Sequence, residues 1–173
     1  MFTSNYWNYK VFVESQSITN GSEWTKIDLG LKGLDGNTVL FLKNRQDSAA
    51  QYYYVYGTLG IRSGLGVVVG TGIAAPAIGD YAMGSDVTSS LSNTAVSSTT
   101  GVDGEAGIKT VITFTGTNNT GSPITITEYG ITKAINTGSQ NTTPVLIIHM
   151  LLPEPIEVES GHGFTLPIEW SEA

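Results

Sequence analysis

Residues 107–131 contain the strongest local pattern in the chain, and they read GIKTVITFTGTNNTGSPITITEYGI. Every second residue from Ile108 to Phe114 falls on one side of a two-residue repeat, and Ile124 and Ile126 repeat this alternation with threonine between them. Alternation of β-branched residues is typical of strands with one buried face. The pattern therefore predicts two strands. The link between them is rich in Gly, Asn and Ser, so we expect an antiparallel hairpin with a long loop.

The rest of the chain repeats this combination of short β-forming runs and turn residues. An Asp-Gly turn at Asp35 predicts a hairpin from 24–31 and 38–42, since Asp-Gly is a strong signal for tight turns. Further strands are predicted at 52–56, 89–98, 145–152, 156–159 and 164–170, with loops at 74–87, 99–107 and 133–143 and a strand end at Pro153 and Pro155. No amphipathic helix of useful length is expected. The predicted fold class is all-β, an antiparallel β-sandwich (Ig-like or jelly-roll-like) with an N-terminal arm or hairpin.

Charged and aromatic residues are distributed unevenly along the chain. Its length of 173 residues is typical of one structural domain. Residues 1–66 hold six basic and five acidic side chains (+1), whereas 67–173 hold two and ten (−8), which together give the net charge of −7. Eleven of the sixteen aromatic residues also lie in 1–66. We expect 1–66 to supply the arm, first strands and partner docking, and 67–173 the remainder of the sandwich. The excess of acidic residues argues against binding to nucleic acid. The sequence has no apolar run long enough to span a membrane. It also has no cysteine, which excludes disulfides.

Three segments, in order, resemble virion structural proteins of tailed bacteriophages. They are 69–82 (VGTGIAAPAIGDYA), 114–131 (FTGTNNTGSPITITEYGI) and 145–169 (VLIIHMLLPEPIEVESGHGFTLPIE). ITITEYGI and PIEVESGHGFTLPIEW are the more specific parts, and His162 and Gly163 replace the small polar pair expected in that turn. The resemblance covers the region after residue 68. It implies a small β-sandwich with a structural role in the virion, no catalysis, and the major capsid protein or other virion proteins as partners.

Within this family, we expect a capsid decoration (cement) protein that binds the major capsid lattice and is located in the virion. A homo-oligomer is expected, with a trimer favoured because capsid lattices have local threefold axes. One alternative is a tail-tip, baseplate or fibre-attachment protein. Another is a carbohydrate-binding module, in which the tyrosines of YYYVY stack on sugars; these are Tyr52, Tyr53, Tyr54 and Tyr56.

The aromatic residues near the N-terminus are candidates for partner docking, and they are Tyr6, Trp7, Tyr9 and Phe12. Tyrosine and tryptophan dominate the energetics of many interfaces. The competing interpretation is a first strand whose aromatic side chains enter the core.

The run VLIIHMLL predicts a strand that is buried on both sides or covered by a partner. Its core or oligomer residues would be Val145, Ile147, His149 and Leu151. Glu128 continues the inward phase of Ile126, so a regular strand would bury its carboxylate. Such burial requires either a bulge that turns the side chain away, or backbone N–H donors or a cation such as Arg62 as partners. We expect Glu128 to be a structural buried acid.

No catalytic residue, metal or cofactor is predicted. Only His149 and His162 could act as a general base, and neither lies near a GxSxG nucleophile motif. His162 lies between glycines and is expected to be solvated. Asp103 and Glu105 are two acids in a loop, and calcium requires more oxygen ligands than this pair supplies.

Overall fold

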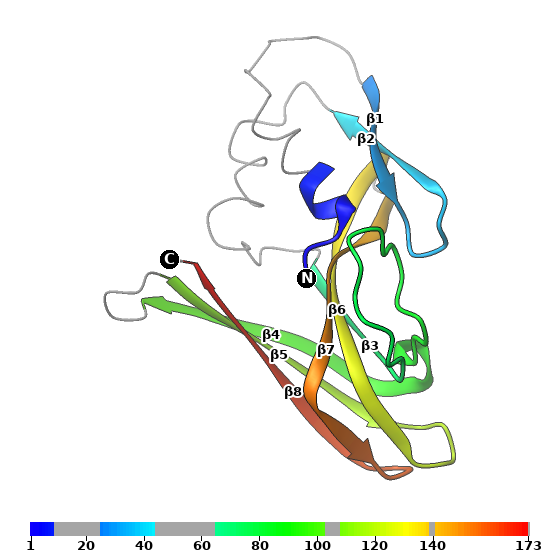
Figure 1. The fold of residues 1–173 in the computed structure, drawn as a ribbon, viewed down its shortest axis with the longest axis vertical. Coiled ribbons are helices and arrows are strands. Elements are labelled where there is room, and N and C mark those ends of the chain that lie inside the picture. Colours follow the sequence, from blue (N-terminus) through cyan, green and yellow to red (C-terminus); the bar gives the residue numbers. More distant parts are fainter. Residues whose placement is uncertain (9–24, 44–64, 103–107, 139–140, 173) are drawn as a thin grey trace.

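The computed structural model describes residues 1–8, 25–43, 65–102, 108–138 and 141–172 (Figure 1). Its strands and one 3-10 turn are β1 (Thr25–Lys32), β2 (Thr38–Lys43), β3 (Leu65–Gly70), η2 (Thr88–Ser90), β4 (Leu91–Val102), β5 (Ile108–Asn118), β6 (Ile124–Gly138), β7 (Asn141–Val158) and β8 (Gly163–Glu172). Residues 4–8 are helical. Within the described ranges, none of the helical segments has the length and apolar character that crossing a membrane requires.

Two antiparallel three-stranded sheets, β3-β6-β7 and β4-β5-β8, form the body of the protein. Figure 1 shows that they lie against each other at one end and diverge toward the other. The β1–β2 pair forms a separate hairpin, as the Asp-Gly turn predicts. The predicted all-β fold with antiparallel, sandwich-like packing is therefore confirmed.

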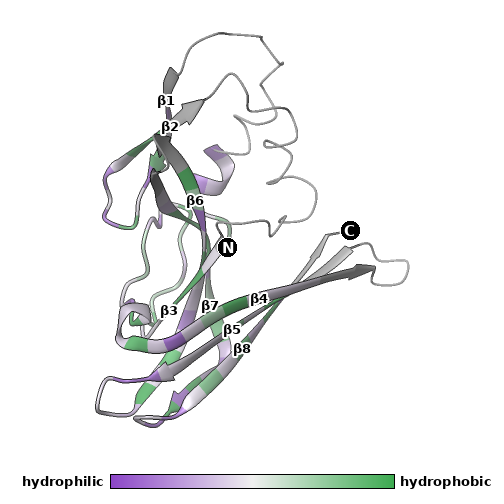
Figure 2. Ribbon diagram, turned by 180° about the vertical axis from the view of Figure 1, so that it is seen from behind, coloured by the Kyte–Doolittle hydropathy of each residue, from purple (hydrophilic) through white to green (hydrophobic). Residues whose placement is uncertain are grey.

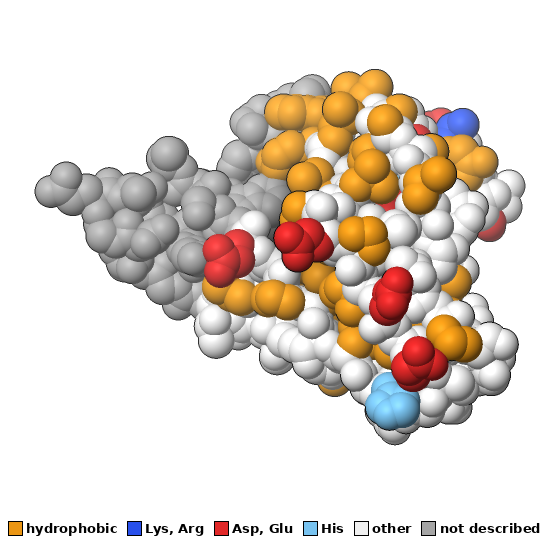
Figure 3. Space-filling model, turned by 60° about the horizontal axis from the view of Figure 1, so that its bottom comes forward, with side chains coloured by type: hydrophobic (Ala, Val, Ile, Leu, Met, Phe, Trp, Pro, Cys, Tyr) orange, Lys and Arg blue, Asp and Glu red, His pale blue; other side chains and the backbone are white. Residues whose placement is uncertain are grey.

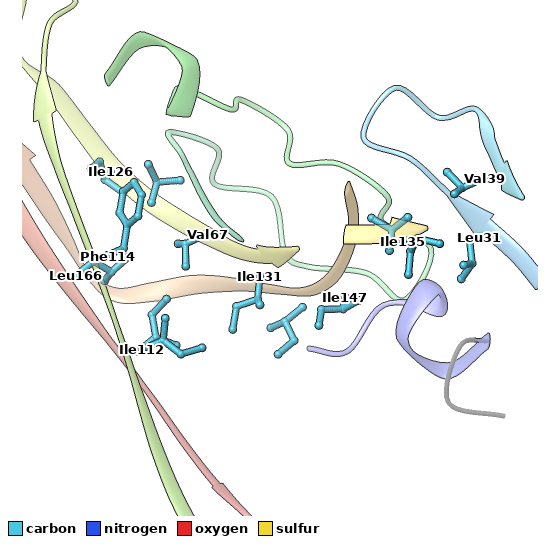
Figure 4. Packing of buried hydrophobic residues seen from close by; sticks show 14 of the residues in the cluster. Leu31, Val39, Val67, Ile112, Phe114, Ile126, Ile131, Ile135, Ile147 and Leu166 are labelled. Atoms are coloured by element: carbon cyan, nitrogen blue, oxygen red, sulfur yellow. The ribbon is translucent and has the colours of Figure 1, made fainter. Parts of the chain in front are cut away.

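Alternate residues of the strands supply the core between the two sheets, and Figure 2 shows hydrophobic and polar residues interspersed along them. The main cluster combines residues of both sheets and of the hairpin: Leu31, Val39, Val67, Val69, Ile112, Phe114, Ile126, Ile131, Ile135, Val145, Ile147, Ile148, Val158, Leu166 and Ile168. Figure 4 shows part of this cluster between β5, β6 and β8. Burial of each large aliphatic or aromatic side chain contributes about 1.5–3 kcal/mol relative to exposure.

The hairpin predicted from residues 107–131 is wrong, although both of its strands are present. β5 pairs with β4 and β8, whereas β6 pairs with β3 and β7, so the link crosses from one sheet to the other. Phe114 and Ile126 are 1% and 0% exposed and belong to the same cluster. The two strands therefore interact through side chains across the sandwich. A two-residue repeat identifies the buried face of a strand but does not identify its hydrogen-bonded neighbour.

Asn118 holds this crossing in place and is itself fully buried. Its side-chain nitrogen donates to the carbonyl of Ser122 at 2.8 Å and to the carbonyl of Val158 at 2.9 Å. Its side-chain oxygen accepts the N–H of Thr120 at 3.0 Å. These bonds tie the end of β5 to the end of β7, which lies in the other sheet.

Three predicted boundaries are also wrong. Residues 133–143 were expected to form a turn, but β6 continues to Gly138 and β7 begins at Asn141, so most of the segment is paired strand. β4 continues to Val102, past the predicted start of the loop at 99. Pro153 and Pro155 do not end β7, because the ladder shifts register between the Ile126 and Glu128 pairings and then resumes. β7 lies at the edge of its sheet, where a missing N–H is tolerated.

The β1–β2 hairpin packs onto one end of the β6–β7 pair. Leu31 and Val39 belong to the same buried cluster as Ile135 and Val145, and Gly33 forms an isolated bridge with Val145. The hairpin thus shares the core of the sandwich. Residues from 1–66 and from 67–173 contribute to one continuous hydrophobic cluster.

Candidate functional site

A long loop, residues 71–87, connects β3 to η2 and is attached at its base by backbone hydrogen bonds. The N–H of Thr71 donates to the carbonyl of Ser85, and the N–H of Val87 donates to the carbonyl of Val69, both at 3.0 Å. The hydroxyl of Thr88 also accepts the N–H of Val69 at 2.8 Å. We call residues 71–87 the clamped loop.

A cluster of three ionisable side chains, two of them buried, lies beneath the clamped loop. His149 Nε2 is 2.7 Å from Glu128 Oε2, and His149 Nδ1 is 2.6 Å from Asp80 Oδ2. The side chains of His149 and Glu128 are 5% and 1% exposed, and that of Asp80 is 26% exposed. His149 comes from β7, Glu128 from β6 and Asp80 from the clamped loop, so the cluster joins the sheet to the loop.

Strand register explains how Glu128 and His149 meet. Glu128 is opposite Leu151 on β7, and His149 is two residues before Leu151, so the two side chains project from the same face. Gly70 of β3 is opposite Glu128, and Gly130 of β6 is opposite His149. Gly70 and Gly72 provide the room, since a Cβ atom at either position would clash with the Glu128 carboxylate, and one at Gly70 would also clash with the backbone of the clamped loop.

Glu128 also binds the loop backbone directly. Its Oε1 accepts the N–H of Gly72 at 3.1 Å and the N–H of Ser85 at 3.4 Å. The neighbouring Thr127 hydroxyl donates to the carbonyl of Gly72 at 2.6 Å. On the loop side, Asp80 Oδ2 accepts the N–H of Ala77 at 2.8 Å. Both carboxylates therefore hold loop backbone as well as the imidazole.

The two short contacts of His149 require two shared protons. Either an imidazolium donates to two carboxylates, or a neutral ring bonds one carboxylate and one carboxylic acid. In both arrangements each ring nitrogen is engaged, so the ring has no lone pair directed at a substrate. A nucleophile triad needs such a lone pair next to a hydroxyl or thiol. The geometry therefore suits a clamp more than a reacting centre.

The outward side of the clamped loop is apolar. Ile73 is 83% exposed, Ile78 is 60% exposed and Tyr81 is 40% exposed. The Lys32 ammonium lies 5.5 Å from the centre of the Tyr81 ring. Isolated exposed hydrophobic residues are common, but several on one internally bonded loop are typical of an interaction surface. We call Ile73, Ile78 and Tyr81 the apolar loop residues.

The first eight residues contact β7 and the clamped loop. The Thr3 hydroxyl donates to the carbonyl of Leu146 at 2.6 Å, and the N–H of Ser4 donates to the carbonyl of Ile78 at 2.6 Å. The Asn5 side chain bonds both the N–H and the carbonyl of Lys32, at 2.8 and 2.9 Å. This segment is thus built into the fold.

Of the predicted docking residues, Tyr6 and Trp7 are described, and Tyr9 and Phe12 lie outside the described residues. Tyr6 packs against the core and stacks on Phe2 with ring centroids 4.0 Å apart, whereas Trp7 is 42% exposed. The competing interpretation of a first strand is wrong for residues 4–8, which are helical. The docking role itself stays a prediction.

The predicted core strand is buried by the protein itself. Val145, Ile147 and His149 are at most 5% exposed, and Leu151 is partly buried. Leu146 joins a second small cluster with Val68 and with Met83 of the clamped loop, on the side of the sheet that carries His149, because the register shifts between Ile131 and Thr132. Both faces of β7 are therefore covered without a partner in this region.

The remaining acidic and aromatic residues of interest, and His162, are exposed or lie outside the described residues. His162 is exposed, with Nδ1 3.3 Å from the Ser160 carbonyl oxygen. Glu154, Glu157 and Glu159 are exposed, and Figure 3 shows acidic groups spread among hydrophobic side chains on one face. Arg62, Asp103, Glu105 and the tyrosines of 52–56 lie outside the described residues. Among the residues that are described, no group of three or more His, Asp or Glu side chains is arranged to hold a metal ion.

The sequence predicted the burial of Glu128 and His149 separately and missed that they bind each other. A usable signal was present, since two ionisable residues in apolar β-runs need partners that such runs do not supply. Asp80 gave no such signal, because an acid in a glycine-rich loop is most simply solvated. Its role depends on how the clamped loop folds back over β7.

No family model, curated protein or solved structure matches this chain.

Proposed function

We propose that this protein is a non-enzymatic structural component of a tailed-bacteriophage virion, and more narrowly a capsid decoration protein. The observation that carries the proposal is the clamped loop. The buried Glu128 and His149 and the partly buried Asp80 hold the loop in place from below, while Ile73 and Ile78 project from it into solvent. Such a construction suits docking, because a loop that is already ordered loses little conformational entropy on binding.

The resemblance of segments 69–82, 114–131 and 145–169 to virion proteins supports the same proposal. The first of these segments contains all three apolar loop residues, and the other two contain Glu128 and His149. The parts of the chain that carry the resemblance are thus the parts that build and hold the clamped loop.

Docking works through burial of surface repeated over a lattice. Full burial of one isoleucine contributes about 1.5–3 kcal/mol, so full burial of Ile73 and Ile78 together is worth about two to four orders of magnitude in affinity. Many identical contacts on one shell then act together, although each is modest. Trp7 is partly exposed and belongs to the helical segment whose Ser4 bonds the backbone of Ile78, and it is proposed as a further contact residue.

The first experiment counts copies of the protein in purified particles by quantitative mass spectrometry. A decoration protein is expected at a copy number comparable with the major capsid protein. A few copies per particle would instead assign it to the tail tip, baseplate or fibre attachment. Absence from particles would overturn the virion proposal altogether.

The second experiment measures binding to undecorated shells of the corresponding major capsid protein. The Ile73→Ser/Ile78→Ser double variant is expected to bind at least about a hundredfold more weakly. The matched control is Leu40→Ser, which removes an exposed aliphatic side chain from β2 and should bind normally. If the double variant and the control bind equally well, the clamped loop is not the docking surface. Substitutions are preferable to deletion of the N-terminus, because Thr3 and Asn5 are buried and a deletion would disturb the fold.

A further inference from the structure

The outer edge of β4 differs from the other sheet edges of the protein. In the described residues, β4 pairs with β5 on one side, and no strand or isolated bridge pairs with its other side. After a bulge between Ser92 and Ala95, where Asn93 has a φ of 51°, residues 95–102 pair with β5 without interruption. β4 therefore presents a regular row of backbone donors and acceptors along its outer side.

The other edges of the two three-stranded sheets carry features that hinder strand addition. β7 is bridged by Phe2 at Ile148 and by Gly33 at Val145, and β3 is bridged at Gly70 by Asp86. β8 contains Pro167, Glu169 and Glu172, and proline and charge are the usual protection of an exposed edge. β4 has neither, since its sequence is LSNTAVSSTTGV.

We infer that β4 is a self-association edge, at which two copies of this chain pair their β4 strands antiparallel around a twofold axis. The pairing would join the two β4-β5-β8 sheets into one continuous sheet. A second copy is the occupant that the charges favour. The chain carries a net charge of −7, yet residues 87–102 contain no charged side chain, so two copies meet there without placing like charges opposite each other.

The side chains of β4 also suit such a pair. Residues 93–97 and Thr99 are exposed, and Val96 is 40% exposed. Threonine, serine and valine are favourable in cross-strand pairs. Pairing at β8 would instead add the charged Glu169 of each copy to the joined strands. The inference does not depend on the proposed virion function.

Equilibrium sedimentation of the full chain over a range of concentrations tests the inference. The chain is expected to form a dimer, and Thr99→Lys is expected to weaken dimerisation at least about tenfold, because each copy then brings a positive charge to the uncharged pairing edge. High salt should partly restore dimerisation of this variant by screening the repulsion. The matched control is Thr125→Lys, which makes the same change at an exposed residue of the central strand β6 and should leave the dimer intact.

Hydrogen exchange provides a second readout that does not depend on a variant. Amides within residues 95–102 that face the outer edge should become more protected as the concentration of the chain rises. A chain that stays monomeric, a trimer, or a dimer that Thr99→Lys leaves unchanged would each overturn the inference. Binding of β4 to a strand of a different protein by an otherwise monomeric chain would overturn it as well.

Discussion

Substitution of Glu128 tests whether the buried cluster holds the clamped loop. In Glu128→Gln, the side-chain oxygen can still accept the N–H of Gly72, and the new amide can donate to Nε2 of a neutral His149. The other ring nitrogen can then donate to Asp80, so every polar group keeps a partner. The loss is a charge-assisted bond replaced by a neutral one, which costs about 1 kcal/mol.

Glu128→Leu removes every acceptor at this position. The N–H groups of Gly72 and Ser85 lose a partner, and His149 is left buried with one ring nitrogen unbonded. Breaking a buried charged network by removing one member costs about 3–5 kcal/mol. We therefore expect Leu to be several-fold more destabilising than Gln, although leucine is the more hydrophobic residue.

Denaturant and thermal unfolding of the purified variants measure this difference. For a chain of this size, about 1 kcal/mol corresponds to a shift in Tm of about 2–4 °C. The expected decreases are therefore about 2–4 °C for Glu128→Gln and about 10 °C for Glu128→Leu. Glu157→Gln, at an exposed residue of β7, is the matched control and should change stability by less than about 0.5 kcal/mol.

Two results would refute the reasoning. If Glu128→Leu melts within about 2 °C of the unaltered protein, the carboxylate does not hold the loop. If Gln and Leu are equally destabilising, the hydrogen bonds are not the source of the effect. Hydrogen exchange adds a local check, since Glu128→Leu should deprotect the amides of Gly72 and Ser85 before those of the central strands.

Three further substitutions test other parts of the structure. Burial lowers the pKa of Lys133 below its usual 10.5, so the unfolded chain holds this proton more tightly. Lys133→Met should therefore raise Tm at pH 7, with a smaller gain near pH 10, and a gain that grows with pH would contradict this. Gly72→Ala places a Cβ atom 2.5 Å from a buried carboxylate oxygen and should cost about 1–3 kcal/mol in chemical denaturation, whereas Gly79→Ala, with nothing within 4 Å, should be neutral. Asn118→Ala leaves a buried carbonyl of β7 unbonded and should cost about 2–4 kcal/mol by the same measurement, and a neutral result would remove its role at the crossing.

Local patterns in the sequence were sufficient for much of the fold. The alternation through Ile112 and Phe114 predicts a strand with a buried side, and these residues are 1% exposed. The apolar run through Val145 and Ile147 predicts a strand covered on both faces, as the structure shows. These predictions succeed because a strand exposes alternate residues to different environments, whatever its neighbour in the sheet.

The local patterns did not determine which strands are hydrogen-bonded to each other. β5 and β6 have compatible patterns and a link of ordinary length, yet the link crosses between sheets and is held by Asn118. Each strand can pair with several others, and in the structure β5 pairs with β8 whereas β6 pairs with β7. The sequence of residues 107–131 alone does not show that its two strands belong to different sheets.

The sequence by itself determined the strand content, the inward sides of the strands and the burial of Glu128 and His149, because these follow from the period of side chains along an extended backbone. Only the tertiary structure decided that Asp80 reaches His149, that two glycines leave space for the cluster, and that the loop above it is held. The physical reason is that the clamp joins residues from two strands and a loop. Their contact is set by sheet register and by the path of a long connection, neither of which has a local signature.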